Sequence, residues 1–528
     1  MKKILIILLI AISAGSCNFL DVEPEKSVTY TNYFKDEAEV EALFFYMFSL
    51  ESGAFAAVEP TIHDIMGLKC DDIYTSHISM SGNMAMGFRN LDPSFFLNRD
   101  TDSRVSWKAY YDIIYIANMV LDNEYRFKNI SDERKQFWLA QAWFAKRLAY
   151  FYIARTWGDA PIVPDSEYKD PLAKSPVKEV LEEALRCGEK ALTLPKHNEP
   201  DMINSKGARI TSKQYASLGT AYTLMANIYA WMGGLYDSEG YWTKAEECAT
   251  KVIENKAGTY GLESIETLCD NVFGKTRQSN EIIFNIEISP IDRNYFTEIN
   301  EWMFCPGQLL ITYPVISSDT TRENDVISKF GLLGGNEPVE ARIKYATVKT
   351  IYPESSDKRL SEFWFKFGKE KNNREDPENR YSYIYKWRMP IYSVNEEAKR
   401  PYLGVEGNKV IWRLADLILL RAECRARLGL TTAIDDLNRI RSRAGLGGYA
   451  GTGDLRKEVF RERERELFGE GQRYYAAVRN GYFSEISEAM GALTTNDINN
   501  GAIYLPVGEM AFKENSLMRQ NIYWSWKN

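Results

Sequence analysis

Hydrophobic residues recur every three or four positions along much of the chain. The clearest case steps by 3, 4, 3, 4 and 3 residues through Tyr215, Leu218, Tyr222, Met225, Tyr229 and Met232. In an α-helix of 3.6 residues per turn, positions with this spacing share one face. The same period predicts helices within residues 36–50, 104–255 and 410–480. We interpret these hydrophobic faces as core, and not as cofactor sites.

Two long segments lack this period. Residues 53–103 are rich in Gly, Ser, Asn and Asp, which is typical of a long loop region. Residues 258–408 contain short strand-like runs, such as 281–286 and 381–387, separated by glycine, proline and polar residues. The tail, residues 482–528, is predicted to be loop with short helical turns. The predicted fold class is therefore mainly α, a helical platform with a large irregular, loop- and short-strand-containing insertion.

Small residues mark the ends and contacts of the predicted helices. Gly158, Gly233 and Gly429 each follow an aromatic- or alanine-rich segment, as expected of a glycine that caps a helix in the left-handed conformation. Alanines at matching offsets precede two of these glycines, and a second helical pattern follows each of the two. Small residues let paired helices approach closely. The pattern predicts a tetratricopeptide-like platform of helix pairs, with spacing too irregular for a plain solenoid.

The N-terminal segment is typical of an exported protein. Lys2 and Lys3 precede an apolar run at residues 4–12, and small residues then lead to Cys17. An apolar run this short does not span a hydrocarbon core, which needs about 20 residues, so we interpret residues 1–16 as a signal peptide. The alternative is a buried N-terminal helix or strand. Residues 17–528 are then expected to form a single domain.

Residues 14–17, Ala-Gly-Ser-Cys, resemble a bacterial lipobox with Ala14 in place of the usual leucine. Such a motif implies that Cys17 is acylated and becomes the first residue of the mature chain. Acyl chains contribute roughly 0.8 kcal/mol per buried CH₂ group, and several together anchor a protein durably. We therefore expect a protein that is tethered to a membrane through a lipid on Cys17 and does not cross it.

Composition and charge argue against several classes of function. The net charge of −8 and the lack of a basic block with interleaved aromatic residues argue against a nucleic-acid partner. The histidines His63, His77 and His197 have no zinc-binding spacing, and no GxSxG motif occurs. No metal site, cofactor or catalytic residue is therefore predicted, and we expect that the protein is not an enzyme. Carboxylates are abundant enough for a glycosidase pair, but no pair is singled out.

Three further features have structural interpretations. The glycines between residues 445 and 453 follow a predicted helix, whereas phosphate-binding loops follow a strand, so we predict a loop between helices. The alternating charges at residues 461–466 predict a solvated or ion-paired helix surface. The cysteines other than Cys17 are scattered without a CxxC pair, and we expect buried free thiols.

Ligand binding is expected to depend on the loops. A sugar stacks its flat C–H faces on aromatic rings, and its hydroxyl groups need carboxylate, amide or guanidinium partners. Two loop regions contain both kinds of residue. The predicted ligand-binding residues are Asp71, Asp72, Asn83 and Phe88 in the first loop region, and Tyr295, Phe296, Trp302 and Phe304 in the insertion. For each aromatic residue the alternative role is packing in the core.

Several motifs along the chain occur together in one known family of proteins. They lie at residues 17–24, 107–121, 141–151, 157–163, 280–284, 357–359, 413–473, 505–506 and 515–521. The most specific block contains Arg413, Asp416, Asn438, Arg441, Glu462, Glu466, Gly471 and Arg473. In these motifs the chain resembles the SusD-like (RagB/SusD) nutrient-uptake lipoproteins over essentially its whole length. It departs from them after Arg473, where the usual acidic residue is missing, and at Tyr523, which lacks the usual Pro-Gly before it.

The resemblance implies a function that composition and spacing do not. SusD-like proteins have a tetratricopeptide-like helical fold and lie on the outer-membrane surface, where they cover a SusC-like TonB-dependent β-barrel as a hinged lid. Their ligand is commonly a glycan and in some members a peptide. We therefore expect a cell-surface lipoprotein that binds an oligosaccharide or polysaccharide for such a transporter. The alternatives are a peptide-binding member of the family and a tetratricopeptide-type protein-interaction adaptor.

Overall fold

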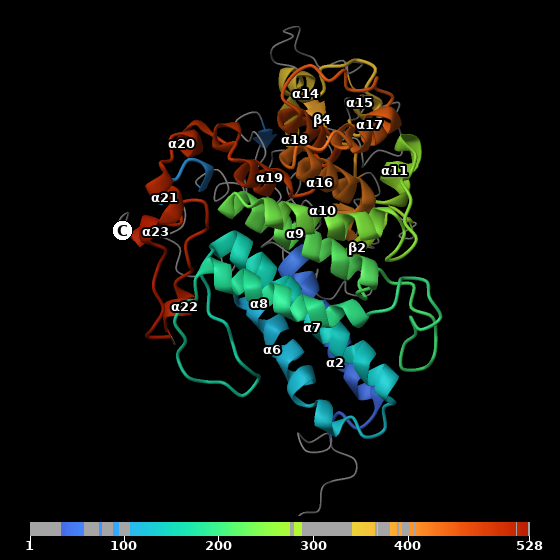
Figure 1. Ribbon diagram of the computed structural model, residues 1–528, viewed down its shortest axis with the longest axis vertical. Helices are drawn as coiled ribbons and strands as arrows, with labels where there is room; N and C mark the ends of the chain where they lie inside the picture. Colours follow the sequence, from blue (N-terminus) through green and yellow to red (C-terminus); the bar gives the residue numbers. More distant parts are fainter. Residues whose placement is uncertain are drawn as a thin grey trace, which may run out of the picture.

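The computed structural model describes most of the helical part of the chain and parts of the irregular regions. The described residues are 33–56, 73–75, 88–93, 106–274, 279–287, 341–364, 367, 381–387, 390–392, 402–405, 407–513 and 515–525. They are mostly α-helical, with short strands in the insertion (Figure 1). Within these ranges no helix combines the length and the apolar character needed to cross a membrane. The predicted fold class is confirmed.

The longer helices form two groups along the chain. The first group contains α2 (Glu37–Glu51), α6 (Lys108–Asp122), α7 (Asp132–Trp157), α8 (Val177–Lys190), α9 (Leu218–Tyr236) and α10 (Glu239–Ile253). The second contains α16 (Leu414–Arg427), α17 (Ala433–Arg443), α18 (Leu455–Glu466) and α19 (Arg473–Asn480). Helix α7 contacts both α6 and α8, α9 packs along α10, and α10 contacts α16, which pairs with α17 (Figure 1). Helix pairs therefore build the platform.

Shorter helices lie in the insertion and in the tail. The insertion contains α11 (Ile265–Asn271), α14 (Tyr345–Ile351) and α15 (Arg359–Glu362). The tail contains α20 (Glu488–Gly491), α21 (Thr495–Asn499), α22 (Met510–Lys513) and α23 (Ile522–Ser525). The prediction of a tail with short helical turns is confirmed.

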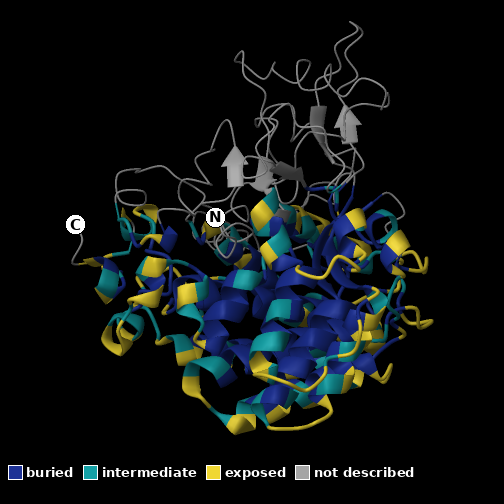
Figure 2. Ribbon diagram, turned by 90° about the horizontal axis from the view of Figure 1, so that it is seen from above, coloured by how far each residue is buried: buried dark blue, intermediate teal, exposed yellow. Residues whose placement is uncertain are grey.

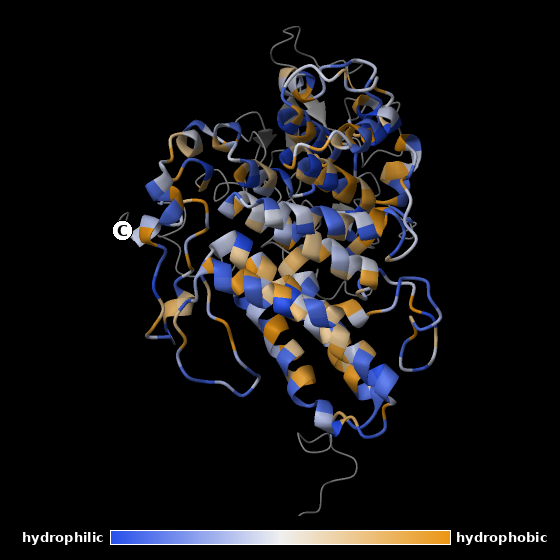
Figure 3. Ribbon diagram, viewed as in Figure 1, coloured by the Kyte–Doolittle hydropathy of each residue, from blue (hydrophilic) through white to orange (hydrophobic). Residues whose placement is uncertain are grey.

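Helix α9 lies at the centre of the platform. Its N-cap residue, Ser217, accepts a hydrogen bond from the backbone N–H of Thr220. Residues 219–233 are buried except Tyr222, because α7, α8, α10, α16 and α19 all contact the helix. Hydrophobic residues follow most of α9 (Figure 3), and buried residues fill the middle of the molecule (Figure 2). The predicted helix is confirmed, but it is buried on nearly all sides and not on one face alone.

The predicted caps are confirmed at two of the three glycines. Gly158 ends α7 with a φ of 78°, and Gly429 follows α16 with a φ of 70°. The prediction for Gly233 is wrong, because α9 continues to Tyr236 and Asp237 takes the left-handed conformation instead. Gly233 is small for another reason: a Cβ atom there would lie 2.8 Å from the ring of Trp242 in α10.

Antiparallel strand pairs connect the insertion to the platform. Strand β2 (Ile282–Ile286) pairs with β7 (Lys409–Arg413), and every residue of both strands is buried. The run predicted at 281–286 is therefore confirmed as a strand. The helix predicted from residue 410 begins only at Leu414, because β7 is an apolar run that completes the pairing of β2. Strands β1 (Ile73–Thr75), β3 (Ala341–Lys344) and β4 (Tyr381–Tyr383) form a second sheet, and β5 (Pro390–Tyr392) pairs with β6 (Tyr402–Val405).

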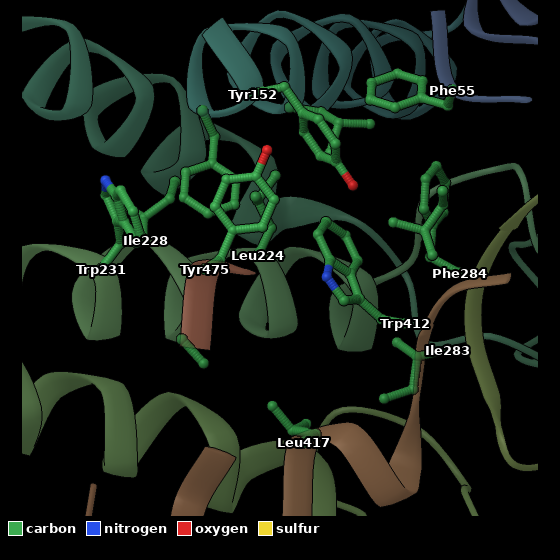
Figure 4. Packing of buried hydrophobic residues seen from close by; sticks show 14 of the residues in the cluster. Phe55, Tyr152, Leu224, Ile228, Trp231, Ile283, Phe284, Trp412, Leu417 and Tyr475 are labelled. Atoms are coloured by element: carbon green, nitrogen blue, oxygen red, sulfur yellow. The ribbon is translucent and has the colours of Figure 1, made fainter. Parts of the chain in front are cut away.

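Aromatic residues join the helices to the β2–β7 pair. Figure 4 shows Trp412 of β7 near Phe284 of β2, with Tyr152 of α7 and Tyr475 of α19 close by. The rings of Phe284 and Trp412 lie 5.7 Å apart. The guanidinium of Arg155 lies 3.9 Å from the ring of Tyr152 and 4.0 Å from that of Tyr475. Such cation–π contacts are strongest where the cation is desolvated, and Arg155 is buried.

Candidate functional site

Most of the predicted site lies outside the described residues. This applies to the lipid anchor Cys17 and to Asp71, Asp72, Asn83, Tyr295, Phe296, Trp302 and Phe304. Phe88 is described, and it has no exposed surface. Its ring lies 5.6 Å from that of Tyr474 and 6.1 Å from that of Trp524. A covered ring cannot stack on a sugar, so Phe88 is a core residue and its assignment as a ligand contact is corrected.

The two irregular regions meet in one small sheet. In the antiparallel pair of β1 and β3, Ile73 is opposite Ile343 and Thr75 is opposite Ala341. Asp71 and Asp72 directly precede β1 in the chain, and the insertion leads into β3. The pairing therefore joins a segment inside one predicted loop region to a segment inside the other. No local pattern in the sequence predicts this pairing, because strands of three or four residues are too short to show a period.

Gln214 links the same two regions at the platform. Its side-chain Nε2 donates to Oε2 of Glu51 at 2.9 Å, and its Oε1 accepts from the backbone N–H of Glu287 at 2.9 Å. Glu51 ends α2, shortly before the first loop region, and Glu287 directly follows β2. Burial raises the pKa of Glu51 to about 8, although the hydrogen bond from Gln214 opposes this shift. At neutral pH the Glu51 carboxyl is therefore mostly protonated and the link is uncharged.

A buried set of ion pairs fixes the insertion to the C-terminal helices. It joins Arg359 to Asp357, Glu462 and Glu466; Arg413 to Glu281, Glu466 and Glu470; Arg443 to Glu281 and Glu466; Lys386 to Glu470; and Arg465 to Glu462. We call these residues the buried ion network. Charges removed from water are tolerated only when they are paired in this way.

The buried ion network corrects the interpretation of residues 461–466. Those charges are ion-paired, as predicted, but residues 462–466 are buried and not solvated. A helix that places alternating charges on a surface looks the same in sequence as one that buries them against matching charges. The difference comes from Arg359, Arg413 and Arg443, which are distant in the chain.

The described residues contain no group of three or more His, Cys, Asp or Glu side chains arranged to hold a metal ion. Burial lowers the pKa of His197 to about 3, and nearby Lys213 adds to the effect, so this imidazole does not act as a base near neutral pH. The described cysteines are free and buried, as predicted: Cys187, Cys248, Cys269 and Cys424. Cys70, Cys305, His63 and His77 lie outside the described residues.

The hollows between the described residues differ in size. One lies beside the two irregular regions, between Phe55, Tyr110, Tyr152, Arg155, β7 and the turn before α19. Its volume of 20 Å³ is enough for a water molecule but not for a sugar ring. This hollow therefore belongs to the packing between the platform and the insertion.

Two larger hollows open on the surface of the platform. The turn hollow has a volume of 410 Å³ and is lined by Glu124, Tyr125, Phe127, Lys128, Asp132, Lys135 and Gln136. The loop hollow has a volume of 270 Å³ and is lined by Trp107, by Tyr111 of α6, by the α7–α8 loop within residues 161–172, and by Ala511, Asn515 and Met518 of the tail. Neither was predicted. The available signal was Tyr168-Lys169-Asp170, an aromatic residue beside two charges between Pro164 and Pro171.

Comparison with known proteins places this architecture in one family. Residues 345–524 match the family model described as the SusD family, and residues 18–245 match the model described as starch-binding proteins associating with the outer membrane. The chain is 23% identical to SusD-like protein P25 of Formosa agariphila over 92% of this chain and 91% of the relative.

Solved structures share the fold. A SusD homologue from Bacteroides thetaiotaomicron has a TM-score of 0.73 at 22% identity and covers 93% of this chain and 98% of its own. The surface glycan-binding protein A from Bacteroides uniformis has a TM-score of 0.66 at 17% identity, over 92% of this chain and 99% of its own. The predicted resemblance is confirmed: the chain belongs to the SusD-like family, whose members are binding proteins associated with the outer membrane.

Proposed function

We propose that this protein captures an oligosaccharide or polysaccharide at the cell surface and delivers it to a SusC-like TonB-dependent transporter in the outer membrane. Membership of a family described by starch binding and outer-membrane association supports the ligand class and the location. The observation that carries the proposal is the pairing of β1 with β3, which joins the two loop regions that are rich in aromatic and polar residues. A binding site assembled from loops is effective when a rigid platform positions them.

The proposed ligand contacts are the predicted residues other than Phe88. Tyr295, Phe296, Trp302 and Phe304 offer aromatic faces to the sugar rings, and Asp71, Asp72 and Asn83 offer hydrogen-bonding partners to the hydroxyl groups. The two sets come from the two regions that the sheet connects. No cofactor or metal ion takes part in this proposal, and the protein acts by binding and not as an enzyme.

A single substitution tests the ligand site. We expect Trp302→Ala to weaken glycan binding by at least about tenfold, as for the aromatic centre of an interface. Affinity electrophoresis in gels that contain one polysaccharide each would identify the ligand, and calorimetry would give the affinity. Tyr125→Ala is the matched control, because Tyr125 is an exposed aromatic residue of the turn hollow. Equal binding by both variants would remove Trp302 from the site.

The lipid anchor and the partner need separate tests. Metabolic labelling with a fatty acid is expected to mark the wild-type chain and not Cys17→Ser, and the labelled chain is expected in the outer membrane. Purification from detergent-solubilised outer membranes is expected to recover a TonB-dependent β-barrel. Recovery of soluble partners without a barrel would favour the adaptor alternative, and binding of peptides but not of glycans would favour the peptide-binding alternative. New reducing ends after incubation with the bound glycan would contradict a purely binding role.

A further inference from the structure

We propose that the loop hollow is a second carbohydrate-binding surface, which takes one end or one branch of the same glycan. The proposal rests on the proposed function for its ligand class, but it concerns different residues. The hollow combines the aromatic side chains of Trp107, Tyr111 and Tyr168 with the polar side chains of Lys169 and Asp170. Its volume of 270 Å³ is just below the range of about 300–1,000 Å³ for pockets that hold drug-sized ligands, so it suits a short stretch of sugar.

The walls of the loop hollow are held in place. The hydroxyl of Tyr111 donates to the carbonyl oxygen of Pro161 at 2.7 Å, and Nδ2 of Asn515 donates to that of Leu172 at 2.7 Å. The backbone N–H of Val163 donates to the hydroxyl of Tyr150 at 2.9 Å. Ser166 donates to Oδ2 of Asp122 through both its N–H and its hydroxyl, each at 2.7 Å. These bonds fix the α7–α8 loop against α6, α7 and the tail, which lowers the entropy cost of binding.

The rim of the loop hollow carries polar groups that the fold does not use. Tyr168, Lys169 and Asp170 are consecutive and exposed, and 38% of the surface of Tyr168 is accessible. Within the described part of the chain, their side chains form no hydrogen bond or ion pair. A carboxylate accepts from sugar hydroxyl groups, an ammonium donates to them, and a tyrosine ring stacks on C–H faces. The rim therefore offers each type of contact that a pyranose ring uses.

The turn hollow is larger, but all its lining residues come from one stretch of the chain, residues 124–136, whereas three separate segments line the loop hollow. In the turn hollow, Lys135 pairs with Asp132 at 3.3 Å, and Nε of Arg126 donates to the hydroxyl of Tyr125 at 2.8 Å. A ligand there would have to compete with these contacts. This difference selects the loop hollow and makes Tyr125 a suitable control.

A second weak surface has a clear benefit for a protein that captures polymers. Once one part of a chain is bound, the effective concentration of its other units rises, and a second contact increases retention without a new high-affinity pocket. The expected contribution of each aromatic or polar contact is small. We expect Tyr168→Ala and Asp170→Ala each to weaken polysaccharide binding by roughly two- to tenfold.

The test uses the full-length mature chain in affinity gels that contain starch, laminarin, xylan, pectin or mucin glycans. Wild type, Tyr168→Ala, Asp170→Ala, their combination, Trp302→Ala and the control Tyr125→Ala are compared. The proposal predicts that the combined variant migrates faster than wild type on the polysaccharide that retards the wild-type chain, while Tyr125→Ala does not. Equal retardation of the combined variant and wild type overturns the second surface and leaves the proposed function intact. No retardation of the wild-type chain in any gel overturns both proposals.

Thermal unfolding separates a binding effect from misfolding. Tyr168 and Asp170 are exposed, so the variants are expected to melt as wild type does. If Tyr168→Ala loses both glycan binding and its melting transition, the variant is misfolded. Tyr168→Phe, which keeps the aromatic ring, is then tested in its place. Retardation equal to wild type for Tyr168→Phe, and weaker retardation for Tyr168→Ala, is the expected pattern for stacking.

Discussion

Arg413 and Glu466 form an ion pair of 2.7 Å between Nη1 and Oε1, and neither side chain has any exposed surface. Arg413 ends β7 and Glu466 ends α18, so the pair joins the strand that holds the insertion to a helix of the platform. Burial acts to raise the pKa of Glu466, but Arg443, Arg413 and Arg359 outweigh it and hold the pKa well below its usual value. The carboxylate therefore stays charged, and the buried ion network depends on each of its members.

Removal of one side chain from the buried ion network should destabilise the folded protein. We predict that Arg413→Met lowers the free energy of unfolding by about 3–5 kcal/mol, because it leaves Glu466 and Glu470 buried with fewer partners. Urea unfolding measures the change. The control is Lys108→Met, which breaks the exposed pair of Lys108 and Asp112 and should cost less than about 1 kcal/mol. Equal losses for the two variants would mean that the buried ion network contributes no more than a surface pair.

Glu51 should make stability depend on pH. Its pKa rises on folding from 4.5 to about 8, so the folded state holds the proton more tightly than the unfolded state. This tighter proton binding stabilises the folded state. The stabilisation is fully present below pH 4.5 and is lost as the pH rises to about 8. Glu51→Gln removes this dependence and keeps an acceptor for Gln214. We predict that the variant is more stable than wild type at pH 8.5, by on the order of a few kcal/mol, and gains much less at pH about 4.5.

Melting temperatures at the two pH values measure this effect. Glu124→Gln is the matched control, because it makes the same substitution at an exposed position in the α6–α7 turn. A gain for Glu51→Gln that is the same at both pH values would show that the carboxyl keeps its ordinary pKa.

Gly233 should not tolerate a methyl group. A Cβ atom there meets the Trp242 ring at 2.8 Å, inside the contact between α9 and α10. We predict that Gly233→Ala destabilises the protein by about 1–3 kcal/mol, although alanine is the better helix former, because overpacking outweighs propensity. Gly261→Ala is the matched control, since a Cβ atom at Gly261 has no neighbour within 4 Å. If both variants unfold at the same urea concentration, the close approach of the two helices is not required.

Phe88 should contribute to the stability of the fold and should not contact the ligand. Its ring is fully buried against Tyr474 and Trp524, so Phe88→Ala leaves a cavity and should cost about 3–5 kcal/mol. Unfolding and glycan binding are measured on the same sample, at a temperature where the variant is folded. Loss of affinity without loss of stability would return Phe88 to the ligand site.

The sequence by itself determined the features that depend on local periodicity and local backbone preference. The spacing of hydrophobic residues gave the helices of the platform, and glycine gave the ends of α7 and α16 at Gly158 and Gly429. The SusD-like motifs gave the family. For the ligand site, composition indicated which loops contain suitable side chains, but it did not separate a ligand contact from a core ring, as Phe88 illustrates.

Tertiary structure alone decided the features that depend on residues far apart in the chain. Residues 410–413 form a strand because β2 supplies a pairing edge, and Gly233 packs under a tryptophan of the next helix. Glu462 and Glu466 can be buried because Arg359, Arg413 and Arg443 neutralise them. The pairing of β1 with β3 likewise unites two loop regions that no local signal connects. The physical reason is the same in each case: burial and pairing energies belong to contacts between segments, and a local pattern records only one side of such a contact.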